Sequence, residues 1–184
     1  MKRFFLLTFL CFVHTGVPSA EAPLSDLKTV WGPVTNGLKA GVRFLQNGQH
    51  RVAESLQVDF LIASTQTSNI VVGLPKPEER YMIHLHDAAK REVPKTLKGK
   101  RLGQTTDAKN LRDLPQRGRL GVLLPESKSP TSLGSIKIGE LFNVPKAGDY
   151  ALSGDIVVFQ IGENRQLRKI KIPFSAQLAI ELDE

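Results

Sequence analysis

Two histidines spaced two residues apart are the feature of the sequence closest to a reactive site. His84 and His86 would project from the same face of a β-strand, close enough to share one metal ion. His50 would be a third ligand only if the fold brought it near. Two ligands are fewer than a structural zinc site needs, so we favour two solvated surface histidines. The alternative is a weak metal-binding protein that takes copper, nickel or zinc incidentally.

Covalent and acid–base catalysis find little support in the residue types. Cys11 is the single cysteine, and it lies in an N-terminal segment that we expect to be removed. The sequence has no Gly-x-Ser-x-Gly elbow. The carboxylate pairs Glu54 with Asp59 and Glu78 with Glu79 are interpreted as solvated side chains. We therefore predict no catalytic residues and no cofactor, and expect that the protein is not an enzyme.

Positive charge gathers in residues 87–119, which hold ten basic and four acidic residues, a net charge of +6 within a chain of +7. Such a cluster attracts anionic partners, here an envelope protein, an acidic polysaccharide or lipid headgroups. Nucleic acid is disfavoured, because the segment lacks an aromatic residue for base stacking. The alternative is a solvated loop that only keeps the protein soluble. The candidate binding residues are Lys90, Arg91, Lys95, Lys98, Lys100, Arg101, Lys109, Arg112, Arg117 and Arg119.

Trp31 is the single tryptophan and stands beside two turn-forming residues, Gly32 and Pro33. We expect it to pack against one end of the domain as a lid. The alternative function is a carbohydrate-binding sandwich, in which Trp31 or Tyr81 would stack on a sugar ring.

The N-terminus has the form of a secretory signal peptide, residues 1–22. Lys2 and Arg3 precede a short apolar run, residues 4–13, and the small residues around Ala20-Glu21-Ala22 suit cleavage. The apolar run is too short to cross a bilayer. We therefore expect a secreted or periplasmic protein that is not integral to the membrane, with one domain over residues 23–184.

Short alternating segments bounded by turn residues predict the fold of that domain. They indicate an all-β, antiparallel sandwich of about seven to nine strands, with residues 87–119 as one long basic loop. A short helical turn is expected within that loop, at residues 106–114, and Pro173 indicates an edge or a kink. The expected strands cover residues 38–44, 56–62, 70–72, 81–86, 120–124, 136–138, 150–158 and 170–180.

Gly148, Tyr150 and Leu152 have the spacing of a tyrosine corner, in which a tyrosine near the start of a strand anchors the preceding loop. Leu152 takes the place that a cysteine has in antibody domains. The corner indicates a β-sandwich.

Two segments resemble uncharacterised exported bacterial domains. Trp31-Gly32, with Asn36-Gly37-Leu38-Lys39-Ala40-Gly41-Val42, is similar to their WG…NGLxAGL opening. Leu141 through Leu152 is similar to their xLFxxxKxGxYxL segment. The resemblance covers both ends of the mature chain and leaves the basic middle unmatched. It implies an immunoglobulin-like sandwich in the cell envelope and brings no catalytic residues.

Overall fold

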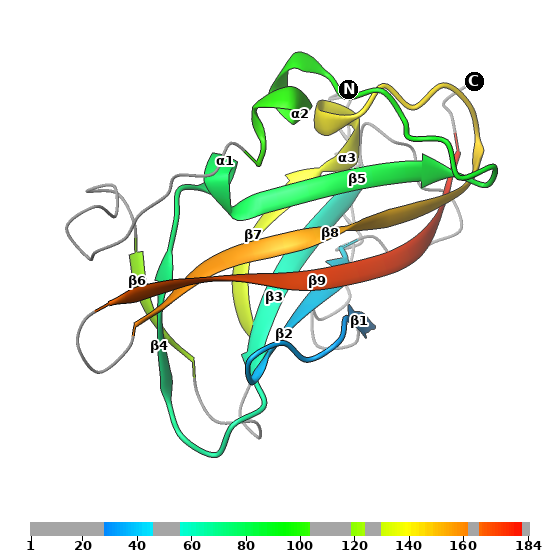
Figure 1. Cartoon of the computed structure of the whole chain (residues 1–184). Coiled ribbons are helices and arrows are strands. Elements are labelled where there is room, and N and C mark those ends of the chain that lie inside the picture. The colour runs from blue at the N-terminus through cyan, green and yellow to red at the C-terminus, as the bar shows by residue number, and fades with distance from the viewer. Residues whose placement is uncertain (1–27, 46–55, 104–118, 124–129, 162–165, 182–184) are drawn as a thin grey trace, which may run out of the picture.

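A computed structural model describes residues 28–45, 56–103, 119–123, 130–161 and 166–181, with the backbone alone at residues 119–123. These residues form nine strands in two antiparallel sheets and three short helices (Figure 1). The antiparallel all-β prediction is confirmed. The predicted signal peptide and its cleavage site lie outside the described residues.

The first sheet has four strands in the order β1-β2-β3-β7. The second is built on β8, which pairs with β9 along one side and with β5 and then β4 along the other; β6 lies beyond β4. The strands are β1 (Thr29–Trp31), β2 (Leu38–Phe44), β3 (Gln57–Ser64), β4 (Ile70–Leu74), β5 (Tyr81–Asp87), β6 (Arg119–Leu123), β7 (Thr131–Lys137), β8 (Gly148–Ile161) and β9 (Leu167–Ile180). The helices are α1 (Pro77–Arg80), α2 (Leu97–Arg101) and α3 (Ile138–Leu141).

Alternation along the strands selects the face that each presents to the core. On β2 and β5, alternate residues are buried, as the period of a pleated strand requires. On β9 every second residue from Ile170 to Ile180 is buried. Pro173 is opposite Asp155 of β8, and β9 pairs with no other described strand, which confirms the predicted edge position.

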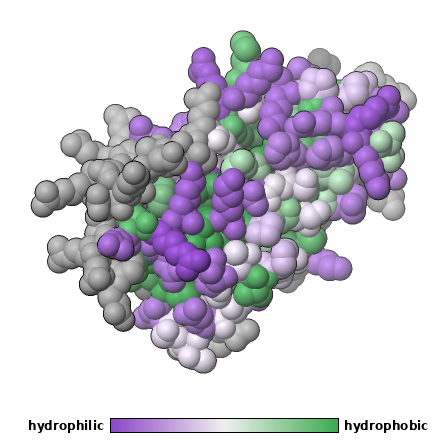
Figure 2. Space-filling view, in the orientation of Figure 1, coloured by the Kyte–Doolittle hydropathy of each residue, from purple (hydrophilic) through white to green (hydrophobic). Residues whose placement is uncertain are grey.

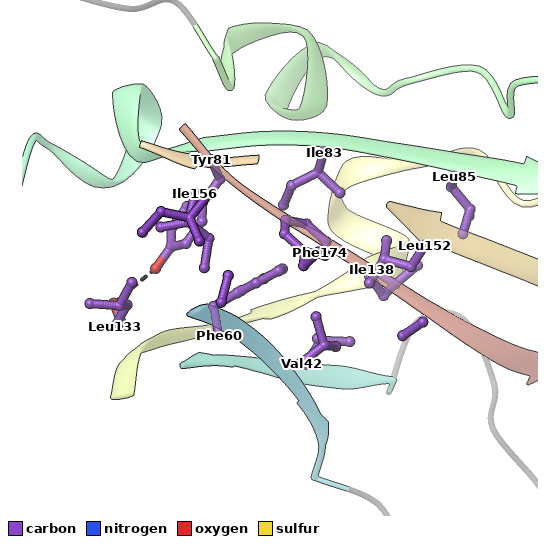
Figure 3. Packing of buried hydrophobic residues seen from close by; sticks show 14 of the residues in the cluster. Val42, Phe60, Tyr81, Ile83, Leu85, Leu133, Ile138, Leu152, Ile156 and Phe174 are labelled. Carbon is purple, nitrogen blue, oxygen red and sulfur yellow. Dashed lines mark hydrogen bonds between the residues drawn. The ribbon is translucent and has the colours of Figure 1, made fainter. Parts of the chain in front are cut away.

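Phe60 of β3 joins the two sheets in one core (Figure 3). Its ring centroid lies 4.8 Å from that of Tyr81 on β5 and 5.3 Å from that of Phe174 on β9. All three side chains are at most 2% exposed. Truncating a phenylalanine in such a position costs about 3–5 kcal/mol, so this cluster is a principal source of stability.

The tyrosine-corner contact is present. The Tyr150 hydroxyl donates a hydrogen bond to the Lys146 carbonyl oxygen at 2.7 Å, and Tyr150 itself is buried. Burial raises the pKa of its phenol. The bond fixes the loop before β8 to the strand that carries the tyrosine.

The long basic loop predicted at residues 87–119 is described as far as residue 103. The chain turns after β5, returns along its edge through a hydrogen bond from Val93 N to Leu85 O, and forms α2, a helix that was not expected. Ile138 begins α3 where a strand was expected. The helical turn predicted at residues 106–114 lies outside the described residues.

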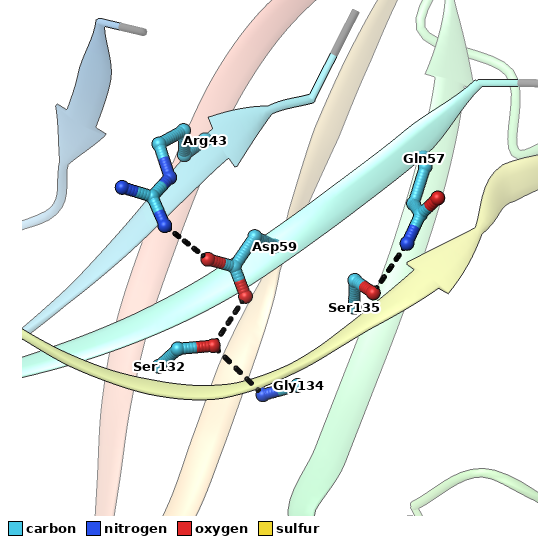
Figure 4. A network of polar contacts seen from close by, with 6 residues as sticks. All are labelled: Arg43, Gln57, Asp59, Ser132, Gly134 and Ser135. Atoms are coloured by element: carbon cyan, nitrogen blue, oxygen red, sulfur yellow. Dashed lines mark hydrogen bonds and ion pairs between the residues drawn. The ribbon is translucent and has the colours of Figure 1, made fainter. Parts of the chain in front are cut away.

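Polar contacts fasten β7 to the first sheet on the face away from the core (Figure 4). Asp59 of β3 accepts hydrogen bonds from Arg43 of β2 and Ser132 of β7, each at 2.6 Å. Gln57 Nε2 also donates to Ser135 Oγ at 2.5 Å. Asp59 is only 4% exposed, and these partners satisfy a carboxylate that would otherwise be costly to bury.

Candidate functional site: a groove between α2 and β7

The two histidines of β5 point away from the core, as predicted. Their rings are stacked, with centroids 6.3 Å apart. His84 Nδ1 lies 2.7 Å from Glu92 Oε1, and this hydrogen bond holds the pKa of Glu92 below its ordinary value. Within the described ranges, no group of three or more His, Cys, Asp or Glu side chains could hold a metal ion. His50 lies outside those ranges.

Trp31 lies on β1, at the edge of the first sheet, and is half-buried. Its ring covers Gly41 of β2, where an added Cβ would come within 2.7 Å of it. Lys39 Nζ lies over the ring, 4.9 Å from its centroid. The ring is thus packed on its own sheet, and a lysine lies over it.

Of the carboxylate pairs that the sequence offered, Glu54 lies outside the described residues, and Asp59 is held by Arg43 and Ser132. Glu78 and Glu79 are adjacent in the first turn of α1.

The structure describes the side chains of six of the ten basic candidates. Arg91 pairs with Asp87 at 2.8 Å, and Lys98 pairs with Glu140 of α3. The other four, Lys90, Lys95, Lys100 and Arg101, have no ion-pair partner among the described residues. Lys109, Arg112 and Arg117 lie outside the described residues, and of Arg119 only the backbone is described.

Helix α2 owes its position to contacts with α3 rather than to an amphipathic pattern. Thr96 caps it: its hydroxyl accepts a hydrogen bond from Gly99 N and donates one to Glu140 O. Thr96 N also donates to Leu141 O. A Cβ on Gly99 would lie 2.1 Å from that same oxygen, so only glycine permits this approach.

A groove of about 880 Å³ lies between α2 and β7. Leu97, Lys98 and Arg101 of α2 form one wall, and Gly134–Lys137 of β7 forms the other; Tyr81, Leu102 and Leu141 also line it. Leu97 is 80% exposed and is one of the apolar residues of this lining. In Figure 2, hydrophilic residues gather at the top of the view, where α2 lies, and hydrophobic surface shows between them.

A β-bulge sets the geometry of the β7 wall. Phe60 and Leu61 of β3 pair with Gly134 and Ser132, which leaves Leu133 as the extra residue. The freed Leu133 carbonyl accepts a hydrogen bond from Arg80 Nη1 at 2.8 Å. It also accepts one from the Tyr81 hydroxyl at 2.9 Å (Figure 3). Arg80 is the last residue of α1 and Tyr81 the first residue of β5, so these two hydrogen bonds tie β7 to the start of β5.

The sequence singled out the charges of this groove but missed its walls. Lys98 and Arg101 were candidates, whereas Leu97, Lys137 and the edge of β7 were not. The sequence does carry one signal for α2: a threonine cap before Leu97 and a glycine, Gly103, after the helix, a pair that marks helix ends.

Searches against protein-family models, curated proteins and solved structures found no match to this chain. Among the helices that the structure describes, none has the length and apolar character needed to span a membrane.

Proposed function

We propose that the protein is an exported, non-enzymatic module of the cell envelope that binds an anionic partner through the basic surface of α2. Its two sheets, which share one core and carry a tyrosine-corner contact, support an immunoglobulin-like sandwich. Export is supported by the signal-peptide pattern of residues 1–22.

The observation that carries the proposal is the ordered cluster of cations around α2. Residues 87–103 hold six basic and two acidic residues, a net charge of +4. Lys100 and Arg101 are exposed and have no carboxylate partner in the described part of the chain. Because the helix is anchored to α3, the backbone that carries these cations is in place before a ligand arrives, which lowers the entropic cost of binding.

The alternative functions gain less from the geometry. Trp31 covers Gly41 and lies under Lys39, contacts that favour a packing role over a sugar platform. His84 Nδ1 is already hydrogen-bonded to Glu92, which weakens the case for His84 as a metal ligand.

The proposal is tested with the full chain and two immobilised polyanions, polyglutamate and alginate. A variant with Lys98, Lys100 and Arg101 each changed to Gln is compared with a control in which Lys28, Lys146 and Lys171 are changed to Gln. Both lose three positive charges, but the control residues neither belong to α2 nor line the groove beside it. We expect at least tenfold weaker binding for the α2 variant and a lower eluting salt concentration, because exposed charge contacts are screened by salt. Equal losses in the two variants would show that net charge alone drives binding and would overturn the proposal.

A further inference from the structure

We infer that the groove between α2 and β7 binds an extended peptide segment that alternates acidic and apolar residues and pairs with the free edge of β7. This inference rests on the proposed function and names the chemistry of the anionic partner.

The free edge of β7 supplies the backbone groups for such pairing. In the described part of the chain β7 pairs only with β3 and is the last strand of its sheet. After the bulge at Leu133, residues 134–137 pair in regular register with β3, and the same four residues line the groove. An edge strand presents unpaired N–H and C=O groups that an extended peptide can satisfy.

The bulge and Lys137 also set the length of the pairing. Bulges and lysines are devices that protect sheet edges from unwanted strands. Here the bulge stands at one end of the regular segment and Lys137 at the other, so the accessible edge covers about four residues, or about 14 Å of extended chain. The site is therefore suited to a short linear segment and excludes a long strand.

The walls match a peptide with two kinds of side chain. The apolar part of the lining comes from Leu97, Leu102 and the buried Leu141. Cationic groups come from Lys98, Arg101 and Lys137, against which stand Glu78 and Glu140. Lys98 already pairs with Glu140, so Arg101 and Lys137, one on each wall, are the cations without an ion-pair partner among the described residues.

Alternation follows from the geometry of an added strand. Successive side chains of the peptide would point to opposite faces, one toward the apolar lining of the groove and the next toward the face that carries Lys137. A polysaccharide offers no apolar side chains for Leu97, and a lipid headgroup offers no backbone amides for β7. A peptide supplies both, together with carboxylates.

The test uses the full chain and four probes. The first is a seven-residue peptide that alternates glutamate and valine. The second is the same peptide with every backbone nitrogen methylated, which keeps the charge and the apolar side chains but removes the N–H donors that strand pairing needs. Polyglutamate and phosphatidylglycerol vesicles are the third and fourth. Calorimetry gives the affinities, and amide hydrogen exchange reports on Gly134–Lys137. Leu97→Ser removes the exposed apolar side chain, and Val34→Ser is its control, because Val34 is 58% exposed and does not line the groove.

We expect the unmodified peptide to bind at least tenfold more tightly than the methylated one, to slow exchange within Gly134–Lys137, and to be weakened by Leu97→Ser but not by Val34→Ser. Equal binding of both peptides, or binding of polyglutamate alone, would overturn the inference while leaving the proposed function intact. Binding of vesicles without the peptide would overturn it in favour of a lipid surface. If none of the probes and no polyanion bound, the inference and the proposed function would fall together.

Discussion

Two glycines of β8 allow a matched test of how tightly β5 and β8 are packed side by side. Gly154 has a φ of +155° and Gly148 a φ of +149°, so alanine meets similar backbone strain at either position. Their surroundings differ. A Cβ at Gly154 would lie 1.8 Å from the carbonyl oxygen of Met82 on β5, whereas a Cβ at Gly148 meets nothing within 4 Å.

The magnitudes follow from this difference. Strain at such a dihedral costs about 1–3 kcal/mol, and this is the full effect expected for Gly148→Ala. Gly154→Ala must in addition move β5, because Cβ contacts below 3.0 Å essentially never occur and the shortfall is about 1.2 Å. Losing two or three ladder hydrogen bonds, at about 0.5–1.5 kcal/mol each, adds about 1–4 kcal/mol. We therefore expect the destabilisation by Gly154→Ala to exceed that by Gly148→Ala by at least about 1 kcal/mol.

Urea unfolding of the full chain and both variants, followed by Trp31 fluorescence and far-UV circular dichroism, gives the free energies of unfolding. A Gly154→Ala protein too unstable to fold agrees with the expectation as long as Gly148→Ala folds. Equal free energies for the two variants, within about 0.5 kcal/mol, would refute the close approach of Met82 as the reason for glycine at position 154.

Three further predictions concern α2, the loop before β8 and the turn after β5. Gly99→Ala should displace α2, because the new Cβ would lie 2.1 Å from Leu141 O; hydrogen exchange should accelerate at Thr96 N while the core strands keep their protection, and unchanged exchange at Thr96 would contradict this. Tyr150→Phe should lower the free energy of unfolding by about 1 kcal/mol, because it removes the bond to Lys146 O; a urea midpoint equal to that of the wild type would show that the corner contributes nothing. Arg91→Ala should raise the pKa of Asp87, which hydrogen bonds from the Arg91 backbone and side chain now hold below its ordinary value; carboxyl NMR titration measures it. Since the folded pKa is depressed, the stability that these contacts supply is present above the unfolded pKa and disappears as the pH falls through the folded pKa. The variant keeps the backbone hydrogen bond, so it should lose only the part of that dependence that the Arg91 side chain supplies.

The strands could be predicted because their signal is local. On β5, alternating residues from Tyr81 to Leu85 are buried, and on β9 the apolar parity holds from Ile170 to Ile180. On both strands the apolar residues share one parity, so the face that packs on the core could be predicted. Pro173 correctly indicated that β9 lies at an edge. On β8, Val157 and Phe159 are buried on the face opposite the core, which their parity alone does not predict.

The groove could not be predicted because its parts come together only through tertiary contacts. The segment Leu97–Arg101 is only five residues long and has a glycine at its centre, which disfavours a helix in isolation. It becomes a helix because Thr96 caps it and Gly99 fits against Leu141 O. Likewise, nothing in the sequence around Arg80 shows that its guanidinium is buried and bound to the Leu133 carbonyl, 53 residues away.

The pairing of β3 with β7 has a consequence for the rate at which the protein folds. β1, β2 and β3 are neighbours in sequence and can pair as soon as they are made, but the fourth strand of their sheet arrives after β4, β5 and β6. The hydrogen bond between Gln57 and Ser135 closes a separation of 78 residues. Non-local pairing of this kind slows folding into the range of milliseconds to seconds. During that interval, the edge of β3 that later pairs with β7 has no partner. In a chain that crosses a membrane N-terminus first, β3 would gain this neighbour only after most of the sequence had emerged.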